Sequence, residues 1–143
     1  MAHYLFSYTH PYRHFVDIDM TIEARGEEQL YFQLPAWRPG RYELGNFSRN
    51  IQKWTAYNEK GEQLLHQKVT KDQWKVDTMG AKTVTIAYNY YANQLNAGST
   101  YVDEYQLYVN PVNCCLYVVG RMEEECSIEL EVPADYEIAC GLE

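Results

Sequence analysis

The alternation of apolar and polar side chains in residues 14–24, the cleanest in the sequence, constrains the fold of this chain more than any other feature. The apolar set is Val16, Ile18, Met20 and Ile22, and the polar set is Asp17, Asp19, Thr21 and Glu23. Because successive side chains of a strand point to opposite faces, this pattern predicts a strand with one buried and one solvated face. Beyond a predicted turn at 25–27, Leu30, Phe32 and Leu34 predict a return strand. We therefore expect residues 14–34 to form a hairpin.

Short strand-like segments separated by turn residues recur along the rest of the chain. The further predicted strands are residues 3–9, 48–57, 63–70, 73–76, 82–92, 105–109, 114–119, 126–132 and 136–140. The 114–119 segment is apolar on both faces, which is typical of a strand in the middle of a sandwich. Roughly ten short strands without a long helix predict an all-β fold, an antiparallel β-sandwich. At 143 residues, the chain is long enough for one such domain with a single core, so we expect residues 1–143 to form a single domain.

The charge and the first residues of the chain narrow the function classes. A formal net charge of -8 argues against nucleic acid and against anionic membrane surfaces as partners, because both require a basic surface. Residues 1–10 lack the basic start and apolar run of a secretion signal. We therefore expect a cytoplasmic protein with no nucleic-acid or membrane partner, and a leader removed before Met1 stays an alternative.

The four cysteines occupy positions 114, 115, 126 and 140, and no two of them form a Cys-x-x-Cys pair. This spacing argues against a zinc knuckle. We expect Cys114, Cys115, Cys126 and Cys140 to be reduced, buried thiols that act as small hydrophobic side chains. A disulfide between Cys126 and one of the adjacent pair is the alternative.

Residues 34–50, which we call the proline loop, read Leu-Pro-Ala-Trp-Arg-Pro-Gly-Arg-Tyr-Glu-Leu-Gly-Asn-Phe-Ser-Arg-Asn. Pro35 and Pro39 lack amide donors and cannot lie inside a central strand. The Pro39-Gly40 pair predicts a type II turn, because glycine accepts the positive φ that this turn needs at its second central position. Two interpretations follow: a rigid connection with Trp37 folded over the core, or a displayed recognition loop.

The proline loop also carries a resemblance to a known family. Its Pro-Ala-Trp-x-Pro-Gly-x-Tyr run at 35–42, followed by Phe-Ser-Arg-Asn at 47–50, resembles the N-terminal domain of glycyl aminopeptidase-type zinc metallopeptidases, the sixty-first metallopeptidase family. Supporting similarity lies at residues 1–4, 73–76, 86–95, 101–103, 116–121 and 139–143. The resemblance covers nearly the whole chain. It implies a β-sandwich that precedes a thermolysin-like catalytic domain, so we expect this chain to be a domain fragment.

No catalytic motif can be placed on these residues. A zinc aminopeptidase needs His-Glu-x-x-His, which the chain lacks. His10 and His14 have the spacing, but Pro11 occupies the position of the glutamate. On a strand the two histidines would also lie about 13 Å apart, at ~3.3 Å per residue. We therefore assign no catalytic, cofactor-binding or metal-binding residue here, do not expect the chain alone to be an enzyme, and expect zinc in the absent catalytic domain.

The resemblance implies a non-catalytic domain of a zinc aminopeptidase that prefers small N-terminal residues such as glycine and alanine. Its expected partners are the catalytic domain of the same polypeptide and, indirectly, the peptide substrate. Arginine and aromatic side chains are frequent interface anchors. Our candidates for the docking or cleft surface are therefore Trp37, Arg38, Arg41, Tyr42 and Arg49. Arg41 or Arg49 is suited to bind a substrate carboxylate through two hydrogen bonds.

A second function remains open from the sequence. Exposed tyrosines and tryptophans on a sandwich also suit a free-standing module that binds a peptide or a glycan through aromatic loops. The two functions predict different association behaviour for the isolated chain. A domain removed from its partner should expose an apolar docking patch and tend to self-associate.

Overall fold

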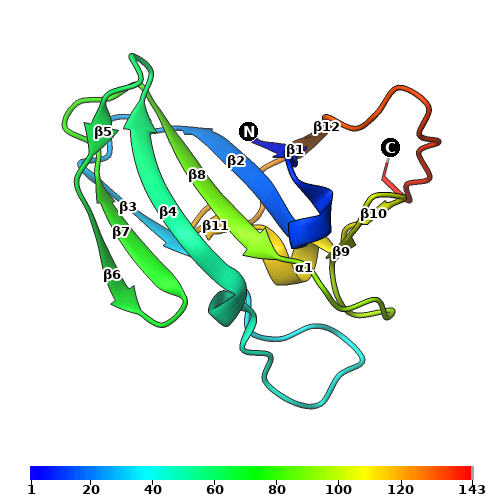
Figure 1. Ribbon diagram of the computed structural model, residues 1–143. Helices are drawn as coiled ribbons and strands as arrows, with labels where there is room; N and C mark the ends of the chain where they lie inside the picture. The colour runs from blue at the N-terminus through cyan, green and yellow to red at the C-terminus, as the bar shows by residue number, and fades with distance from the viewer. Residues whose placement is uncertain (143) are drawn as a thin grey trace.

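The computed structural model describes residues 1–142 and confirms the predicted all-β sandwich (Figure 1). Two sheets pack face to face, one with strand order β12-β1-β2-β8-β4-β5 and one with order β11-β3-β7-β6. The first sheet consists of β12 (Cys126–Leu130), β1 (Ala2–Ser7), β2 (Phe15–Glu23), β8 (Thr83–Tyr91), β4 (Ile51–Asn58) and β5 (Gln63–Leu64). The second consists of β11 (Tyr117–Val118), β3 (Gln29–Gln33), β7 (Gln73–Asp77) and β6 (His66–Thr70).

Short elements complete the described part of the chain. A two-stranded ribbon pairs β9 (Tyr101–Val102) with β10 (Leu107–Tyr108). The helical pieces are two 3-10 turns, η1 (Pro11–Arg13) and η2 (Phe47–Asn50), and one helical turn, α1 (Pro111–Cys114). None of the helices in residues 1–142 has the length and apolar character needed to cross a membrane.

The core lies between the sheets and is built from the predicted alternating positions. On β2 the four apolar side chains of the alternation are at most 2% exposed. Leu30 and Phe32 on β3, and Leu34 just after it, belong to the same core cluster and are equally buried. The predicted inward face of β8, from Val84 to Tyr90 at alternate positions, is buried as well. The period-2 pattern therefore identified the core side of these strands correctly.

The predicted hairpin over residues 14–34 is wrong, because β2 and β3 belong to different sheets. β2 pairs with β1 and β8, whereas β3 pairs with β7 and β11. The connecting turn crosses from sheet to sheet, with Arg25 and Gly26 in the left-handed region (φ 54° and 75°). The Ala24 amide donates to the Lys82 carbonyl (2.8 Å), so the turn is tied to the neighbouring crossing between β7 and β8.

Three further expectations about the C-terminal third need correction. Residues 114–119 do not form a central strand: Pro111 starts the helical turn α1, and the segment continues into the two-residue edge strand β11. Residues 136–140 form no strand. β12 runs parallel to β1, unlike the antiparallel pairs in the rest of the sheet. Residues 114–119 are apolar without forming a central strand because Leu116 and Val118 enter the core from the edge of the sheet, while Val119 is 49% exposed.

Two buried tyrosines fix the α1 segment onto the core. The Tyr88 hydroxyl donates to the Cys114 carbonyl (2.6 Å) and accepts the Leu116 amide (3.3 Å). The Tyr4 hydroxyl donates to the Leu116 carbonyl (2.5 Å). Burial raises the pKa of both phenols well above the usual value of 10.0, so they act as neutral donors. These bonds satisfy backbone groups that no strand ladder serves at this point.

The cysteines are free thiols, but only one of them is fully buried. Cys114 is buried and Cys115 is half-buried, whereas Cys126 and Cys140 are exposed. The expectation of four buried thiols is therefore wrong for the last two. Cys126 starts the edge strand β12, and Cys140 lies in the irregular C-terminal segment, so neither reaches the interior.

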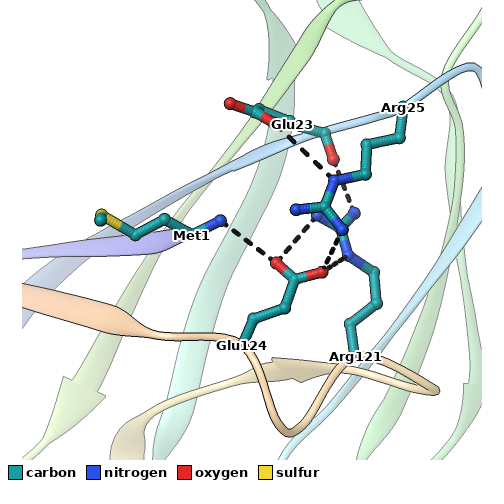
Figure 2. Close-up of polar contacts among 5 residues, drawn as sticks. All are labelled: Met1, Glu23, Arg25, Arg121 and Glu124. Carbon is teal, nitrogen blue, oxygen red and sulfur yellow. Dashed lines mark hydrogen bonds and ion pairs between the residues drawn. The ribbon is translucent and has the colours of Figure 1, made fainter.

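An ion cluster around Glu124 holds the start of β1 against the turn that precedes β12 (Figure 2). The Glu124 carboxylate accepts hydrogen bonds from the Arg121 guanidinium (2.6 and 3.1 Å), from the Met1 amine (3.2 Å) and from Arg25 (2.6 Å). Arg121 also donates to the Glu23 carbonyl (2.6 Å). These donors, Arg121 first, lower the pKa of Glu124 from 4.5 to about 2.

Candidate functional site

The proline loop projects from one end of the sandwich, beyond the ends of β4 and β8 (Figure 1, cyan). Its base is fixed by two backbone bonds, from the Leu34 amide to the Asp72 carbonyl (2.9 Å) and from the Gly45 amide to the Ala36 carbonyl (2.7 Å). The predicted turn is present, since Gly40 has a φ of 84° and the Arg41 amide donates to the Arg38 carbonyl (3.3 Å). The loop is therefore displayed on a fixed base.

Two aromatic side chains of the proline loop, Trp37 and Tyr42, face solvent, whereas Phe47 packs against the core. Tyr42 is 97% exposed and Trp37 is 49% exposed. Trp37 is not among the partly buried side chains that pack against the core. The structure thus contradicts the interpretation in which Trp37 covers the core, and it agrees with the displayed loop.

The three candidate arginines of this end differ in their surroundings. Arg41 is paired with Glu43, with its Nε 2.6 Å from the carboxylate. Arg38 is half-buried against Gly98, and its Nε has no hydrogen-bond partner among the described residues. Arg49 lies at the exposed side of η2 and makes no ion pair within residues 1–142. Arg38 and Arg49 are therefore the candidates that no carboxylate of residues 1–142 neutralises, and of these two Arg49 is the exposed one.

A second loop, residues 93–100, faces the proline loop and is held by a buried amide. Asn113 on α1 is fully buried; its Nδ2 donates to the Gly98 carbonyl (2.9 Å) and its Oδ1 accepts the Thr100 hydroxyl (2.6 Å). The Gly98 amide donates to the Asn96 side chain (2.9 Å). These bonds use the polar groups of the loop internally, which stiffens it.

Two adjoining hollows lie between the loops, with volumes of about 270 and 260 Å³. Residues common to both are Arg49, Asn50, Tyr90, Gln94 and Ser99. Asn50 Nδ2 donates to the Tyr90 hydroxyl (3.0 Å), which joins η2 to β8 across the first hollow. The larger part of the lining is polar side chain, so these hollows suit a polar ligand.

Sequence reasoning found one of these five shared residues and missed the other four. Arg49 came from the proline loop, whereas Asn50, Tyr90, Gln94 and Ser99 were not singled out. The available signals were two segments of the family resemblance: residues 47–50, which contain Asn50, and residues 86–95, which contain Tyr90 and Gln94. Only the pairing of β4 with β8, which places η2 beside the end of β8, brings them together.

His10 and His14 both lie outside the strands of residues 1–142. His10 and His14 flank the 3-10 turn η1 instead of lying on a strand, and β2 begins only at Phe15. The expected spacing along a strand is therefore wrong. The Val102 carbonyl accepts a hydrogen bond from Nδ1 of His14 (2.6 Å). No group of three or more histidine, cysteine, aspartate or glutamate side chains within residues 1–142 is arranged to hold a metal ion.

A larger groove of about 470 Å³ runs between the β1 and β12 edge, the β9–β10 ribbon and the C-terminal segment. Phe6, Leu107, Val109, Ile128 and Leu130 supply an apolar floor. The C-terminal segment that borders it is held loosely: Tyr136 donates to the Glu104 carbonyl at 3.4 Å. Ile138 and Leu142 are more than 60% exposed.

Together, the sandwich and its loop-borne hollows define a β-sandwich domain that presents its candidate binding surface on loops at one end. Residues 3–143 match the peptidase M61 N-terminal domain, so the chain belongs to this family. This match confirms the resemblance carried by the proline loop.

A similar solved structure is the aminopeptidase N family protein from Idiomarina loihiensis. It is 30% identical in sequence and superposes with a TM-score of 0.85 over 94% of this chain. The chain covers only 22% of the length of that protein. No curated protein matches the chain.

Proposed function

We propose that this chain is the non-catalytic N-terminal β-domain of a zinc aminopeptidase that prefers small N-terminal residues, glycine and alanine. The observation that carries the proposal is the family membership over nearly the whole chain, together with a similar domain in a much longer aminopeptidase-family protein. In this proposal zinc and its ligands belong to a thermolysin-like catalytic domain of the same polypeptide.

The domain contributes two surfaces in this proposal. The apolar groove with Ile138 and Leu142 at its border packs on the catalytic domain, because exposed apolar area of this kind is typical of an interface. The loop end, with Trp37, Arg38, Arg41, Tyr42 and Arg49, walls one side of the substrate cleft. Loops on a rigid sheet suit that role, since they can present polar groups without disturbing the core.

The test is to read the coding sequence beyond residue 143 and to assay the longest protein it encodes. We expect a His-Glu-x-x-His motif downstream and zinc-dependent cleavage of glycyl and alanyl p-nitroanilides faster than of the leucyl compound. A chelator should abolish this cleavage and zinc should restore it. Absence of the motif, or a preference for the leucyl substrate, would contradict the proposal.

The alternative, a free-standing peptide or glycan module, is favoured by one observation. Tyr42 and Tyr105 are 97% and 83% exposed, as expected for stacking on a ligand. Screening the chain against glycans and against peptides of more than one length tests it. Tight glycan binding that Tyr42→Ala abolishes would favour the module over the peptidase domain.

A further inference from the structure

The first hollow differs in charge from the rest of the molecule. The chain has 20 acidic and 12 basic residues, yet no aspartate or glutamate lines the first hollow. Its other lining residues are amides, hydroxyls and two phenols, and Arg49 is the cation. In the second hollow the carboxylate of Glu43 is paired with Arg41, so Arg49 is again the uncompensated charge.

Three of the six arginines in residues 1–142 are paired with a carboxylate, and Arg13, Arg38 and Arg49 are not. Of these unpaired three, Arg49 is the one that lines the hollows. Arg25 and Arg121 share Glu124, and Arg41 pairs with Glu43. Arg49 has neither an ion pair nor a side-chain hydrogen bond within residues 1–142, although it borders both hollows. A planar guanidinium in this state offers a pair of parallel donors to a carboxylate.

Two phenolic hydroxyls add donors beside Arg49. The Tyr90 oxygen accepts a hydrogen bond from Asn50 Nδ2, and the Tyr91 oxygen accepts one from Asn93 Nδ2, both at 3.0 Å. Each hydroxyl therefore keeps its own proton for another acceptor. Burial raises the pKa of Tyr90 to about 12, so the phenol stays protonated at neutral pH. The hollow thus presents donors where an anion would lie.

We propose that the first hollow binds the C-terminal carboxylate of a short peptide, with Arg49 as the cation, and that the adjoining second hollow receives the peptide backbone. The second hollow suits a backbone because Asn46 and Gln94 offer side-chain amides and Asn96 offers its Nδ2 group, while Asn96 Oδ1 accepts the Gly98 amide. This inference rests on the proposed function and names its substrate class: short peptides with a free carboxyl end, read at the loop end of the sandwich.

The first experiment uses the 143-residue chain and two probes, glycyl-alanine and its C-terminal amide, titrated with detection by ¹H–¹⁵N NMR. We expect the dipeptide to bind about tenfold or more tightly than its amide, because a bidentate bond to a carboxylate is lost in the amide. The chemical-shift changes on binding should be located at Arg49, Tyr90 and Gln94. Arg49→Gln should reduce the affinity for the dipeptide to that of the amide.

Lys60→Gln is the matched control, because Lys60 is an exposed cation in the turn between β4 and β5, away from residues that line the hollows. It should bind the dipeptide like the wild type. The NMR spectrum of unliganded Arg49→Gln reports whether that variant folds. Equal affinity for acid and amide, or unchanged binding by a folded Arg49→Gln, would overturn the proposal. Acetate binding as tightly as glycyl-alanine would overturn the assignment to a peptide.

A second measurement separates this inference from the proposed function. In the longer protein, the ratio of kcat/KM for glycyl-alanine over its amide should fall about tenfold or more in Arg49→Gln. Cleavage of both substrates at equal rates would contradict the carboxylate site and leave the peptidase domain standing. Binding of the dipeptide to this chain, with no cleavage by the longer protein, would contradict the peptidase function alone.

Discussion

The Arg38 guanidinium packs against Gly98, so closely that a methyl group at position 98 would lie 2.6 Å from its Cζ. This contact joins the proline loop to the 93–100 loop. Gly98 is buried and does not have the positive φ that would by itself require glycine. Glycine is therefore needed here for space, and the space is filled by an arginine from a distant part of the sequence.

Gly98→Ala should displace the Arg38 guanidinium from between the two loops. We expect a loss of about 1 kcal/mol in the free energy of unfolding, at the low end for overpacking, because the colliding group ends a flexible side chain. Urea unfolding measures it. In an Arg38→Ala background the same change should cost at least about 0.5 kcal/mol less. Equal costs in both backgrounds would contradict the collision.

Tyr88→Phe should lower the free energy of unfolding by about 2 kcal/mol, because it leaves the buried Cys114 carbonyl and Leu116 amide without their partner. Tyr31→Phe is the control, since Tyr31 is 38% exposed and its hydroxyl makes no hydrogen bond within residues 1–142. It should change stability by less than about 0.5 kcal/mol. Urea unfolding measures the free energy of unfolding of both variants. A loss for Tyr88→Phe as small as that for Tyr31→Phe would show that the Tyr88 hydrogen bonds contribute little to stability.

The Glu124 cluster predicts a pH dependence of stability. The folded-state pKa of Glu124 is about 2 against an ordinary value of 4.5. The ionised carboxylate therefore stabilises the fold above about pH 4.5, and this contribution is lost as the pH falls toward 2. Urea unfolding at several pH values should show the advantage of the wild type over Glu124→Gln shrinking across this range.

Glu123 offers the matched control for that series. It is exposed and makes no ion pair within residues 1–142. Glu123→Gln should follow the wild type at every pH. A difference between wild type and Glu124→Gln that stays constant from pH 6 to pH 2 would show that the carboxylate acts through something other than its ionisation.

Self-association of the isolated chain tests the apolar groove as a docking surface. We expect the apparent mass in sedimentation velocity to rise with concentration, because Ile138 and Leu142 border an uncovered apolar floor. An Ile138→Asp, Leu142→Asp double variant should stay monomeric. Val69→Asp, on the exposed edge strand β6, is the control and should behave like the wild type. If Val69→Asp abolished association and the double variant did not, the contact between copies would lie at the β6 edge instead.

Sequence reasoning identified the fold through the side chains that obey a two-residue period. Val16, Ile18 and Phe32 lie in the core as expected, because alternation in a strand depends only on local geometry. Sequence reasoning failed where the pairing partner of a strand had to be known. Ile22 and Leu30 are separated by one turn, yet their strands pair in different sheets, and no local pattern distinguishes a hairpin from a crossing between sheets.

The sequence by itself determined the all-β class, the core faces of β2, β3 and β8, the turn at Gly40, and the family through the proline loop. Only the tertiary structure decided that Arg49 lines the hollows without a carboxylate partner, and which residues surround it there. Arg49 meets Tyr90 and Gln94 because β4 pairs with β8. Pairing between distant segments depends on the packing of the whole core, whereas alternation and turn chemistry act between near neighbours in the chain.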